Sequence, residues 1–315
     1  MNSKSLPIVS FLVPSFNRAN LLEQAIGSLL AQSYKNIEII VIDDASTDGT
    51  EGMVRSKFSG VVKYIKNNSN RGVAYSRNLG LSYAKGEFIG LLDSDDILIE
   101  RDCVETAVNT LESNSELSIF TCDVYCIDLL GNKIYEETFF QTVIDHRNIV
   151  LSSGFKDFEY VFFHGIHSCG AVFRKDITKE TGFLDTNYKI AWDEDFFLRL
   201  SVYNSRAIYY HNEALAGYRI HRGSLSDNHC LYLERIKCRQ DILRKNSFIR
   251  KRLGIKANKR LAELHISLID AYLKERKLPQ MLFAGIKSVF LYPLILPELF
   301  MHALSFSKKR FNSKR

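Results

Sequence analysis

The chain has 315 residues, enough for about two domains. Its 46% hydrophobic and 25% charged residues, with 17 Gly and 5 Pro, are typical of a soluble globular protein and exclude collagen-like and linker-rich classes. Residues 1–231 carry 22 Lys and Arg against 30 Asp and Glu, which does not suit nucleic-acid binding, whereas residues 232–315 carry 20 against 6, which suits an anionic surface.

The first hundred residues alternate between strand and helix patterns. Apolar runs predict strands at 8–13, 38–42, 61–65 and 87–92. Helical periodicity predicts helices at 20–30, with Asn20 as the N-cap, and at 50–58 and 73–84. This βαβαβαβ order predicts an α/β fold, a mostly parallel sheet with helices on both faces.

Polar segments follow three of these strands: Pro14–Arg18, Asp43–Asp48 and Asp93–Asp96. Ligands of parallel sheets bind at the carboxyl ends of the strands, and all three segments fall on that edge. The sequence therefore predicts a ligand site there.

The rest of the chain is less regular. Strands are predicted at 118–127, 170–173, 207–210 and 214–220, a helix at 194–202, and a loop or helix at 136–157. From residue 231 onward only helices are predicted, at 231–252, 256–275 and 279–305. We expect two parts: a catalytic domain over 1–228 and a helical extension over 229–315.

Six scattered cysteines without a CxxC pair argue against a zinc ribbon or a dithiol redox site and suggest reduced thiols in a cytoplasm. The apolar N-terminal run is broken by Ser and Pro and lacks a cleavage site, so no secretory signal is expected. No stretch of about 20 uninterrupted apolar residues predicts a transmembrane helix.

Asp93 and Asp95 alternate at a strand end, so their carboxylates can face one ligand. Such oxygen donors suit Mg²⁺ or Mn²⁺. The chain has neither a GxxxxGK[ST] loop nor a GxGxxG motif, so P-loop and dinucleotide sites are disfavoured, and a cation would instead neutralise a diphosphate. By itself, a DxD motif also fits an ordinary acidic turn.

Three stretches together carry a resemblance over about residues 6–225: IVSFLVPSFNRANLLEQAIGSLLAQSYKNIEIIVIDDASTDGT, NNSNRGVAYSRNLGLSYAKGEFIGLLDSDD and GAVFRKDITKETGFLDTNYKIAWDEDFFLRL. They resemble the inverting family 2 glycosyltransferases, which have the GT-A fold. The resemblance implies transfer of a sugar from a nucleotide diphosphate, most often UDP, to a hydroxyl of a glycan or lipid-linked glycan in bacterial surface-polysaccharide assembly. Without a QxxRW signature, single or limited transfer is expected.

The resemblance also implies roles for individual residues. Those implied to bind the nucleotide sugar are Pro14, Ser15, Asn17, Asp44 or its neighbour Asp43, Arg71 with Gly72, Asp93 and Ser94. Asp95, together with Asp93, is implied to hold Mn²⁺ or Mg²⁺. Asp195 is implied as the general base, with Glu194 as the alternative. Arg77 and Asn78 match the signature of the following helix.

Several of these residues have simpler interpretations. Asp195 also fits an acid at a helix N-terminus, which the helix dipole favours. Arg71 also fits a surface charge. Asp96 fits either a metal ligand or, as we favour, the N-cap of the next turn. His221 fits a metal or diphosphate contact and a surface histidine equally well.

His164, His167 and Cys169 form an HxxHxC pattern that superficially suits a metal. It lacks a fourth ligand at a standard zinc spacing, so a core or pocket-wall role is favoured.

The C-terminal part combines an apolar run over 281–296 with Lys308, Lys309, Arg310, Lys314 and Arg315. This pattern favours an interfacial anchor on an anionic membrane surface, and a packing or homo-oligomer surface is the alternative. A cytoplasmic enzyme, peripheral on the inner face of the membrane, is therefore expected.

Two other functions are weaker. A sugar nucleotidyltransferase would need a glycine-rich loop after the first strand, where this chain has PSFNR. A non-catalytic scaffold would not need to keep the DSD and ED motifs.

Overall fold

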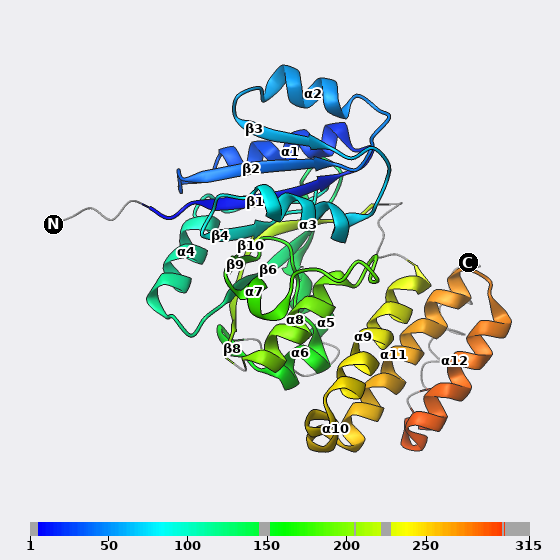
Figure 1. Ribbon diagram of the computed structural model, residues 1–315. Coiled ribbons are helices and arrows are strands. Elements are labelled where there is room, and N and C mark those ends of the chain that lie inside the picture. Colours follow the sequence, from blue (N-terminus) through cyan, green and yellow to red (C-terminus); the bar gives the residue numbers. More distant parts are fainter. Residues whose placement is uncertain (1–5, 145–151, 205, 222–227, 298, 300–315) are drawn as a thin grey trace. The chain divides into compact units, whose positions relative to one another are not determined.

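The computed structural model describes residues 6–144, 152–204, 206–221, 228–297 and 299. Contacts divide the chain into two compact units: a first unit, Met1–Arg222, and a helical unit, Gly223–Arg315 (Figure 1). The division falls a few residues before the boundary predicted after residue 228.

The first four main strands of the first unit form a parallel sheet in the order β3-β2-β1-β4. Their bounds are β1 Val9–Ser15, β2 Ile37–Asp43, β3 Val62–Lys66 and β4 Phe88–Leu91. The helices between them are α1 Ala19–Leu30, α2 Thr50–Lys57 and α3 Val73–Tyr83. The predicted alternation is confirmed, with one correction: α1 begins one residue before Asn20, and Asp48 accepts the Ala19 amide at 3.2 Å.

The second half of the unit extends this sheet in the order β4-β9-β6-β10-β5, with β7 beside β6 and β8 beside β10. β9 runs antiparallel to both β4 and β6, whereas β6 and β10 are parallel. The elements are β5 Ile97–Leu98, α4 Cys103–Ser113, β6 Ile119–Ile127, β7 Lys133–Thr138, α5 Phe139–Ile144, β8 Gly154–Lys156, α6 Phe158–His164, β9 Val172–Arg174, α7 Ile177–Thr181, α8 Trp192–Tyr203 and β10 Ile208–Arg219.

Two predictions in this half need correction. The strands predicted at 207–210 and 214–220 are one strand, β10, whose register shifts between His211 and Ala216. The exposed Asn212 and Glu213 within that irregularity broke the apolar pattern. Residues 136–157 contribute the end of β7, α5 and β8 rather than only a loop or helix.

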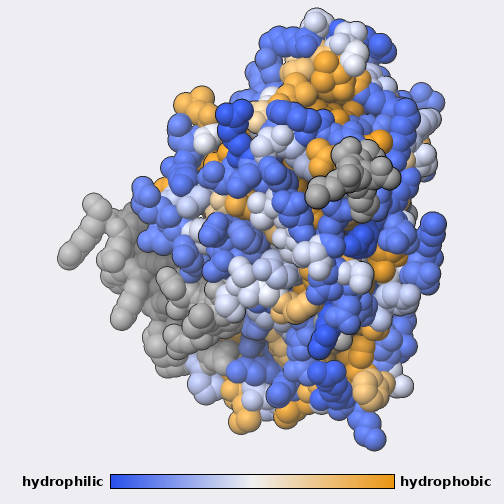
Figure 2. Space-filling model, turned by 90° about the vertical axis from the view of Figure 1, so that its left-hand side faces the viewer, coloured by the Kyte–Doolittle hydropathy of each residue, from blue (hydrophilic) through white to orange (hydrophobic). Residues whose placement is uncertain are grey.

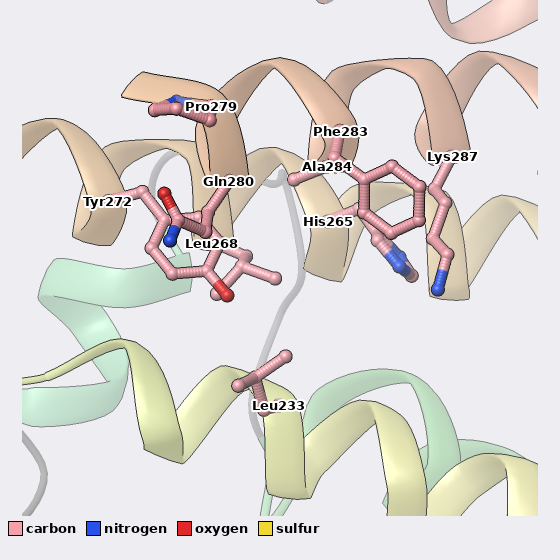
Figure 3. A pocket seen from close by; sticks show the side chains of 9 residues that line it. All are labelled: Leu233, His265, Leu268, Tyr272, Pro279, Gln280, Phe283, Ala284 and Lys287. Carbon is pink, nitrogen blue, oxygen red and sulfur yellow. The ribbon is translucent and has the colours of Figure 1, made fainter. Parts of the chain in front are cut away.

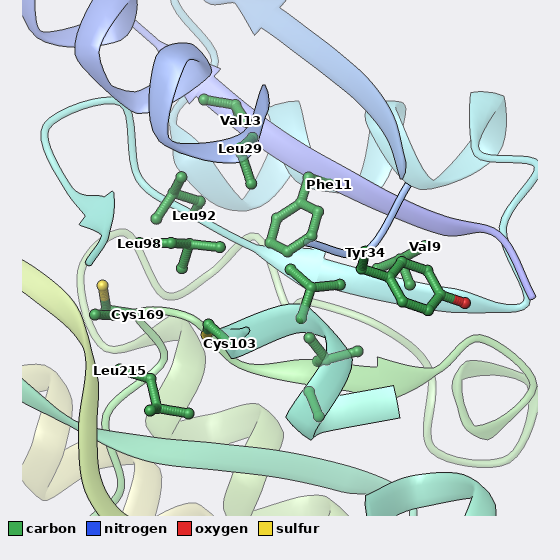
Figure 4. Close-up of a cluster of buried hydrophobic side chains, with 14 of the residues drawn as sticks. Val9, Phe11, Val13, Leu29, Tyr34, Leu92, Leu98, Cys103, Cys169 and Leu215 are labelled. Atoms are coloured by element: carbon green, nitrogen blue, oxygen red, sulfur yellow. The ribbon is translucent and has the colours of Figure 1, made fainter. Parts of the chain in front are cut away.

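The main core fills the space between the sheet and helices α1 and α4 (Figure 4). Val9, Phe11 and Val13 alternate along β1 toward this side, as a strand period of two requires. On the other face α3 lies so close to the sheet that a Cβ at Gly80 would be 2.7 Å from the Ile42 side chain. Helices therefore cover both faces, and ligand access is left to the strand ends.

The helical unit contains α9 His229–Lys245, α10 Ser247–Leu253, α11 Ile255–Lys274, α12 Leu278–Leu291 and a short 3₁₀ turn, Pro293–Ile295. α11 packs against both α9 and α12. The helix predicted at 279–305 is interrupted after Leu291, because Pro293 pushes the preceding Tyr292 out of helical geometry, and helical geometry returns at Leu296 and Pro297. The rest of that prediction, at 298 and 300–305, and the predicted basic residues from Lys308 to Arg315 lie outside the described residues. Among the described helices, none has the length and apolarity to cross a membrane.

On the face shown in Figure 2, hydrophilic residues cover most of the described surface and hydrophobic residues form small separate patches. Scattered apolar residues of this kind are ordinary for a folded chain.

Candidate active site

Hydrogen bonds join the loops that follow β1 and β2 at the carboxyl edge of the sheet. The Asp44 amide donates to the Ser15 carbonyl at 2.8 Å, and the Asn17 amide donates to Ser46 Oγ at 2.9 Å. Asn17 Oδ1 in turn accepts the Thr47 amide at 2.8 Å, with Asn17 at a positive φ of 53°. Two of the three predicted polar segments therefore meet, and Asn17 acts there as a link between the loops.

Ser15, predicted to face the nucleotide, ends β1 with its side chain buried. Its Oγ has no hydrogen-bond partner in the described part of the chain. A buried hydroxyl without a partner is costly, so this atom is suited to a ligand or a water.

Asp44 organises the loop that leads into α3. Its Oδ1 accepts from Asn67 Nδ2 at 2.8 Å and from the Arg71 amide at 2.9 Å, and its Oδ2 accepts the Gly72 amide at 2.7 Å. Gly72 has φ of 85°, a conformation that favours glycine. Asp43 is fully buried and accepts from the Ser46 amide and the Tyr64 hydroxyl. Both aspartates thus hold backbone around the edge.

The loop held by Asp44 forms a small polar hollow of about 180 Å³. Its lining residues are Lys66, Asn67, Asn68, Ser69, Arg71 and Tyr75. The Arg71 guanidinium lies 4.2 Å from the centre of the Tyr75 ring, which holds the cation at the wall of the hollow. The predicted Arg71 therefore belongs to a preformed polar surface beside the strand ends.

The DxD carboxylates are both engaged by cationic groups. Asp95 Oδ2 lies 2.7 Å from Arg18 Nη1 and 3.0 Å from His221 Nε2. Asp93 Oδ1 accepts from Arg77 Nη2 at 2.9 Å. The structure brings the predicted Asp95 and His221 together and adds Arg18 to this group. The sequence signal for Arg18 was its place in the polar segment that follows β1. Ser94, between the aspartates, is buried.

Asp96 is not the N-cap that the sequence favoured. It is buried, and its Oδ1 accepts the amide of Arg219 at the end of β10 at 2.8 Å. Arg219 Nε returns a bond of 2.6 Å to the Asp95 carbonyl. Burial raises the pKa of Asp96 well above its usual range, and the nearby carboxylates of Asp95 and Asp93 raise it further. Asp96 and Arg219 therefore anchor the DxD turn to β10.

Arg77 connects this turn to the start of α8. Its side chain is 1% exposed, and its guanidinium lies 4.0 Å from the centre of the Trp192 ring while it bonds Asp93. Its Nε and Nη1 are buried without hydrogen-bond partners among the described residues. The neighbouring Asn78 exchanges two bonds with the backbone of Leu184, at 2.8 and 3.1 Å. Arg77 and Asn78 thus bring the acids of α8 to the sheet edge.

The three acids of α8 differ in their surroundings. Asp195, predicted as the base, is 5% exposed and accepts from Arg199 Nε at 2.8 Å. Arg199 also donates to the backbone carbonyls of Thr181 and Phe183, which fixes its guanidinium beside Asp195. Glu194 is 6% exposed, and Asp193 is half-buried. The ion pair of Asp195 argues against its taking a proton from a substrate.

The side chains of the HxxHxC pattern pack separately. His167 Nδ1 accepts the Cys169 amide at 3.1 Å, and its ring lies 4.7 Å from the Tyr218 ring. The His164 ring lies 4.9 Å from that of Tyr160. Nowhere in the described ranges do three or more His, Cys, Asp or Glu side chains form a ready metal-binding group.

A divalent cation is nevertheless compatible with the donors at the DxD turn. The Asp95 carboxylate and the His221 imidazole face each other at 3.0 Å, and such donors suit Mn²⁺ or Mg²⁺. These two protein donors leave positions open for Asp93 and for phosphate oxygens. The residues present therefore fit a cation that is completed by a diphosphate, provided that Arg18 releases Asp95 Oδ2.

A second hollow, of about 370 Å³, lies within the helical unit (Figure 3). Its floor is α11, and Leu233 of α9 faces Phe283 and Lys287 of α12 across it. Most of its lining side chains are apolar and none is a carboxylate, so it offers no acid–base pair for catalysis. The DxD turn, by contrast, brings carboxylates and cationic side chains together.

Comparison with known proteins gives a consistent result. The family model for glycosyl transferase family 2 matches residues 10–182, more than half of the chain. An uncharacterized glycosyltransferase of Rickettsia typhi is 30% identical over 68% of this chain and 64% of its own length. An Escherichia coli UDP-Glc:alpha-D-GlcNAc-diphosphoundecaprenol beta-1,3-glucosyltransferase, WfaP, is 27% identical over 85% of this chain and 96% of its own.

The chain spans less than two thirds of some relatives, such as 31% of the glycosyltransferase GlyA of Streptococcus pneumoniae. Among solved structures, a mannosyltransferase of Pyrobaculum calidifontis in complex with GDP-Man and Mn²⁺ has a TM-score of 0.61 at 18% identity, covering 98% of this chain and 81% of its own. Staphylococcus aureus TarS in complex with UDP-GlcNAc has a TM-score of 0.58 at 18% identity, covering 90% and 89%. These likenesses bear out the predicted GT-A fold.

Proposed function

The chain belongs to glycosyl transferase family 2, and from this premise we propose that it transfers a sugar from a UDP-linked donor to a hydroxyl of a glycan or lipid-linked glycan, with inversion. The observation that carries the proposal is the Arg77 guanidinium, which contacts both Asp93 of the DxD turn and Trp192 beside the acids of α8. Arg77 thereby holds the turn proposed to bind the sugar donor and the helix proposed to supply the base at the same edge of the sheet.

The donor end of the proposal is supported by the polar hollow and by related proteins. Pro14, Ser15 and Asn17 belong to the loop that is hydrogen-bonded to the loop after β2. Asp44 of that second loop holds Arg71, whose cation lies at the wall of the polar hollow. TarS has been solved with UDP and with UDP-GlcNAc, and WfaP is named for a UDP-Glc donor and a diphosphoundecaprenol-linked acceptor. We therefore propose a UDP-sugar and a lipid-linked acceptor used in surface-polysaccharide assembly.

Asp95, Asp93 and His221 are the residues that would hold Mn²⁺ or Mg²⁺. Such a cation offsets the negative charge that develops on the departing nucleoside diphosphate. Arg77, paired with Asp93, and Arg18, once it has released Asp95, would supply further positive charge beside the diphosphate.

In the proposed reaction the acceptor oxygen attacks the anomeric carbon as the bond to the diphosphate oxygen breaks, which inverts that carbon. A carboxylate of α8 takes the hydroxyl proton. We favour Asp193 over the predicted Asp195 and Glu194, because it is the least buried of the three acids and Asp195 is paired with Arg199. A single acceptor-side base is consistent with direct displacement.

We further propose that the protein works at the cytoplasmic face of the membrane. All six cysteines are free, as in a reducing compartment, and the proposed lipid-linked acceptor would bring the protein to a membrane.

The test is UDP release from a panel of UDP-sugars with Mn²⁺ and a soluble acceptor. Asp95→Ala should lower the rate by about 10²–10³-fold, because it removes a carboxylate that would hold the cation, and the cation would stabilise the charge on the leaving group. Asp102→Ala, an exposed carboxylate at the start of α4, is the matched control and should keep full activity. No release with any donor, or an unaffected Asp95→Ala variant, rules the proposal out. Pyrophosphate release from a nucleoside triphosphate would point to a nucleotidyltransferase instead.

A further inference from the structure

Helix α12 is apolar on two opposite sides, and within residues 228–297 a neighbouring helix covers one of them. Ala284 and Ser288 are buried toward α11, and Ser288 Oγ donates to the Ala262 carbonyl at 3.0 Å. The other side carries four large apolar residues that are 59–86% exposed, which we call the α12 face: Leu278, Leu282, Ile286 and Phe290. A helix that is apolar all round is normally covered on both sides.

The residues of the α12 face form one stripe. Leu278, Leu282, Ile286 and Phe290 follow at intervals of four, which places them above one another on a helix. Leu294, 71% exposed, continues the apolar surface beyond the helix end. Contiguous exposed apolar surfaces of this kind mark sites of association.

A group of cations lies at the same end of the helical unit as the end of α12. Ser288 bonds the Ala262 carbonyl and α12 ends three residues later, which places the end of α12 beside the first half of α11. α10 leads directly into that half of α11 through Gly254, and Figure 1 shows α10 and the end of α12 at one end of the unit.

The α10 tip mixes basic and apolar side chains. We define it by its exposed residues: Phe248, Arg250, Lys251, Arg252, Ile255 and Lys256. Phe248 is 75% exposed and Ile255 66% exposed, so the cations surround projecting apolar groups. Residues 228–297 as a whole hold 15 Lys and Arg against 5 Asp and Glu. The end of the unit is therefore both apolar and strongly basic.

We propose that the α12 face and the α10 tip dock the protein on a lipid bilayer that contains anionic headgroups. Apolar side chains enter the boundary between headgroups and acyl chains, and the cations contact the headgroups. α12 has 14 residues, about 21 Å at 1.5 Å per residue, against a hydrocarbon core of about 30 Å, so it lies on the bilayer instead of crossing it. A second copy of the chain is a poorer occupant, because it would bring two basic surfaces together.

This inference rests on the proposed function only in that a lipid-linked acceptor gives docking a purpose. The test is co-sedimentation of the full chain with phosphatidylcholine vesicles, with and without phosphatidylglycerol. The chain should sediment with the anionic vesicles, and added salt should weaken this by screening the cations.

Two sets of variants separate the apolar and basic contributions. Arg250→Gln, Lys251→Gln and Arg252→Gln together should weaken partition about 100-fold, since each cation near an anionic surface contributes about 1 kcal/mol. Leu282→Ser with Phe290→Ser should weaken it at least about tenfold. The matched controls change exposed residues of the first unit. One variant changes Lys63, Lys85 and Lys179 to Gln, and the other changes Leu129 and Leu130 to Ser. Both control variants should bind the vesicles as the unaltered chain does.

Absence of binding to anionic vesicles, or equal loss in the control variants, overturns the proposal. So does a dimer, detected by light scattering, that the Leu282→Ser and Phe290→Ser pair dissociates, because the face would then belong to a second copy. UDP release with a soluble acceptor is measured separately. A failed docking test with intact UDP release therefore rejects the docking alone.

Discussion

At the scale of single residues, the acids of α8 show how position on a helix separates chemical roles. Asp193 and Asp195 are two residues apart, so at about 100° per residue their side chains point to nearly opposite sides. Asp195 is on the side of Arg199, which is itself bonded to the carbonyls of Thr181 and Phe183. The two carboxylates therefore have different surroundings, and our proposal gives the proton transfer to Asp193 and leaves Asp195 paired with Arg199.

This separation predicts different effects of two conservative changes. Asp193→Asn should lower kcat by about 10²–10⁴-fold, because an amide cannot take up the acceptor proton although its oxygen can still accept the Glu194 amide. Asp195→Asn should keep most of kcat and lower the stability by about 1–3 kcal/mol, because it leaves the bonds of Arg199 incomplete. Single-turnover UDP release and thermal unfolding measure the two effects. The reverse result would return the role of base to Asp195.

At the scale of elements, the short strand β4 carries the DxD turn and depends on a close approach to β1. Gly90 pairs with Phe11, and a Cβ at Gly90 would lie 2.5 Å from the Phe11 ring. Phe11 is fully buried in the main core, so its ring has no free space to move into. The position of Asp93, three residues further on, therefore depends on a residue without a side chain.

Gly90→Ala should destabilise the first unit by about 1–3 kcal/mol through overpacking. The control is Gly27→Ala on α1, where an added Cβ meets nothing within 4 Å, and it should stabilise by about 1 kcal/mol because alanine favours a helix. Denaturant unfolding compares the two. Equal stability of both variants would show that β1 and β4 separate more easily than the structure indicates.

At the scale of the whole molecule, the two units have separate cores and opposite charge balance. His265 is a titrating group inside the helical unit, where its Nδ1 donates to the Leu261 carbonyl at 2.8 Å. Burial lowers the pKa of His265 below its ordinary 6.5, with the Lys287 charge adding to the effect. The folded unit therefore binds this proton less readily than the unfolded chain does.

The sign of the resulting pH dependence follows directly. The contribution of His265 to the free energy of unfolding is at its full value above about pH 6.5. It is lost as the pH falls toward the lower pKa of the folded state, because the unfolded chain then binds the proton more readily. Thermal unfolding, followed by helical circular dichroism from about pH 7.5 to about pH 5.5, should show a smaller loss of Tm for His265→Asn than for the unaltered chain. His211→Asn, in the first unit, is the control. Identical slopes for His265→Asn and the unaltered chain would contradict the prediction.

Much of the fold followed from local patterns. Strand and helix periodicities, and polar segments at strand ends, are properties of neighbouring residues, so the alternation of β1 to β4 with α1 to α3 could be predicted together with the edge that holds Asp93 and Asp95. The bulged strand β10 could not, because exposed residues at its irregularity interrupt the pattern while pairing with β6 continues through it.

By itself, the sequence determined the order of the elements, the acidic turn at the sheet edge and the excess of basic charge in the last part of the chain. Only the tertiary structure decided which partner each charged side chain takes. Arg219 reaches Asp96, Arg77 reaches both Asp93 and Trp192, and His221 meets Asp95. These contacts join residues far apart in the chain, and the free energy of a buried charge depends on neighbours that only folding supplies.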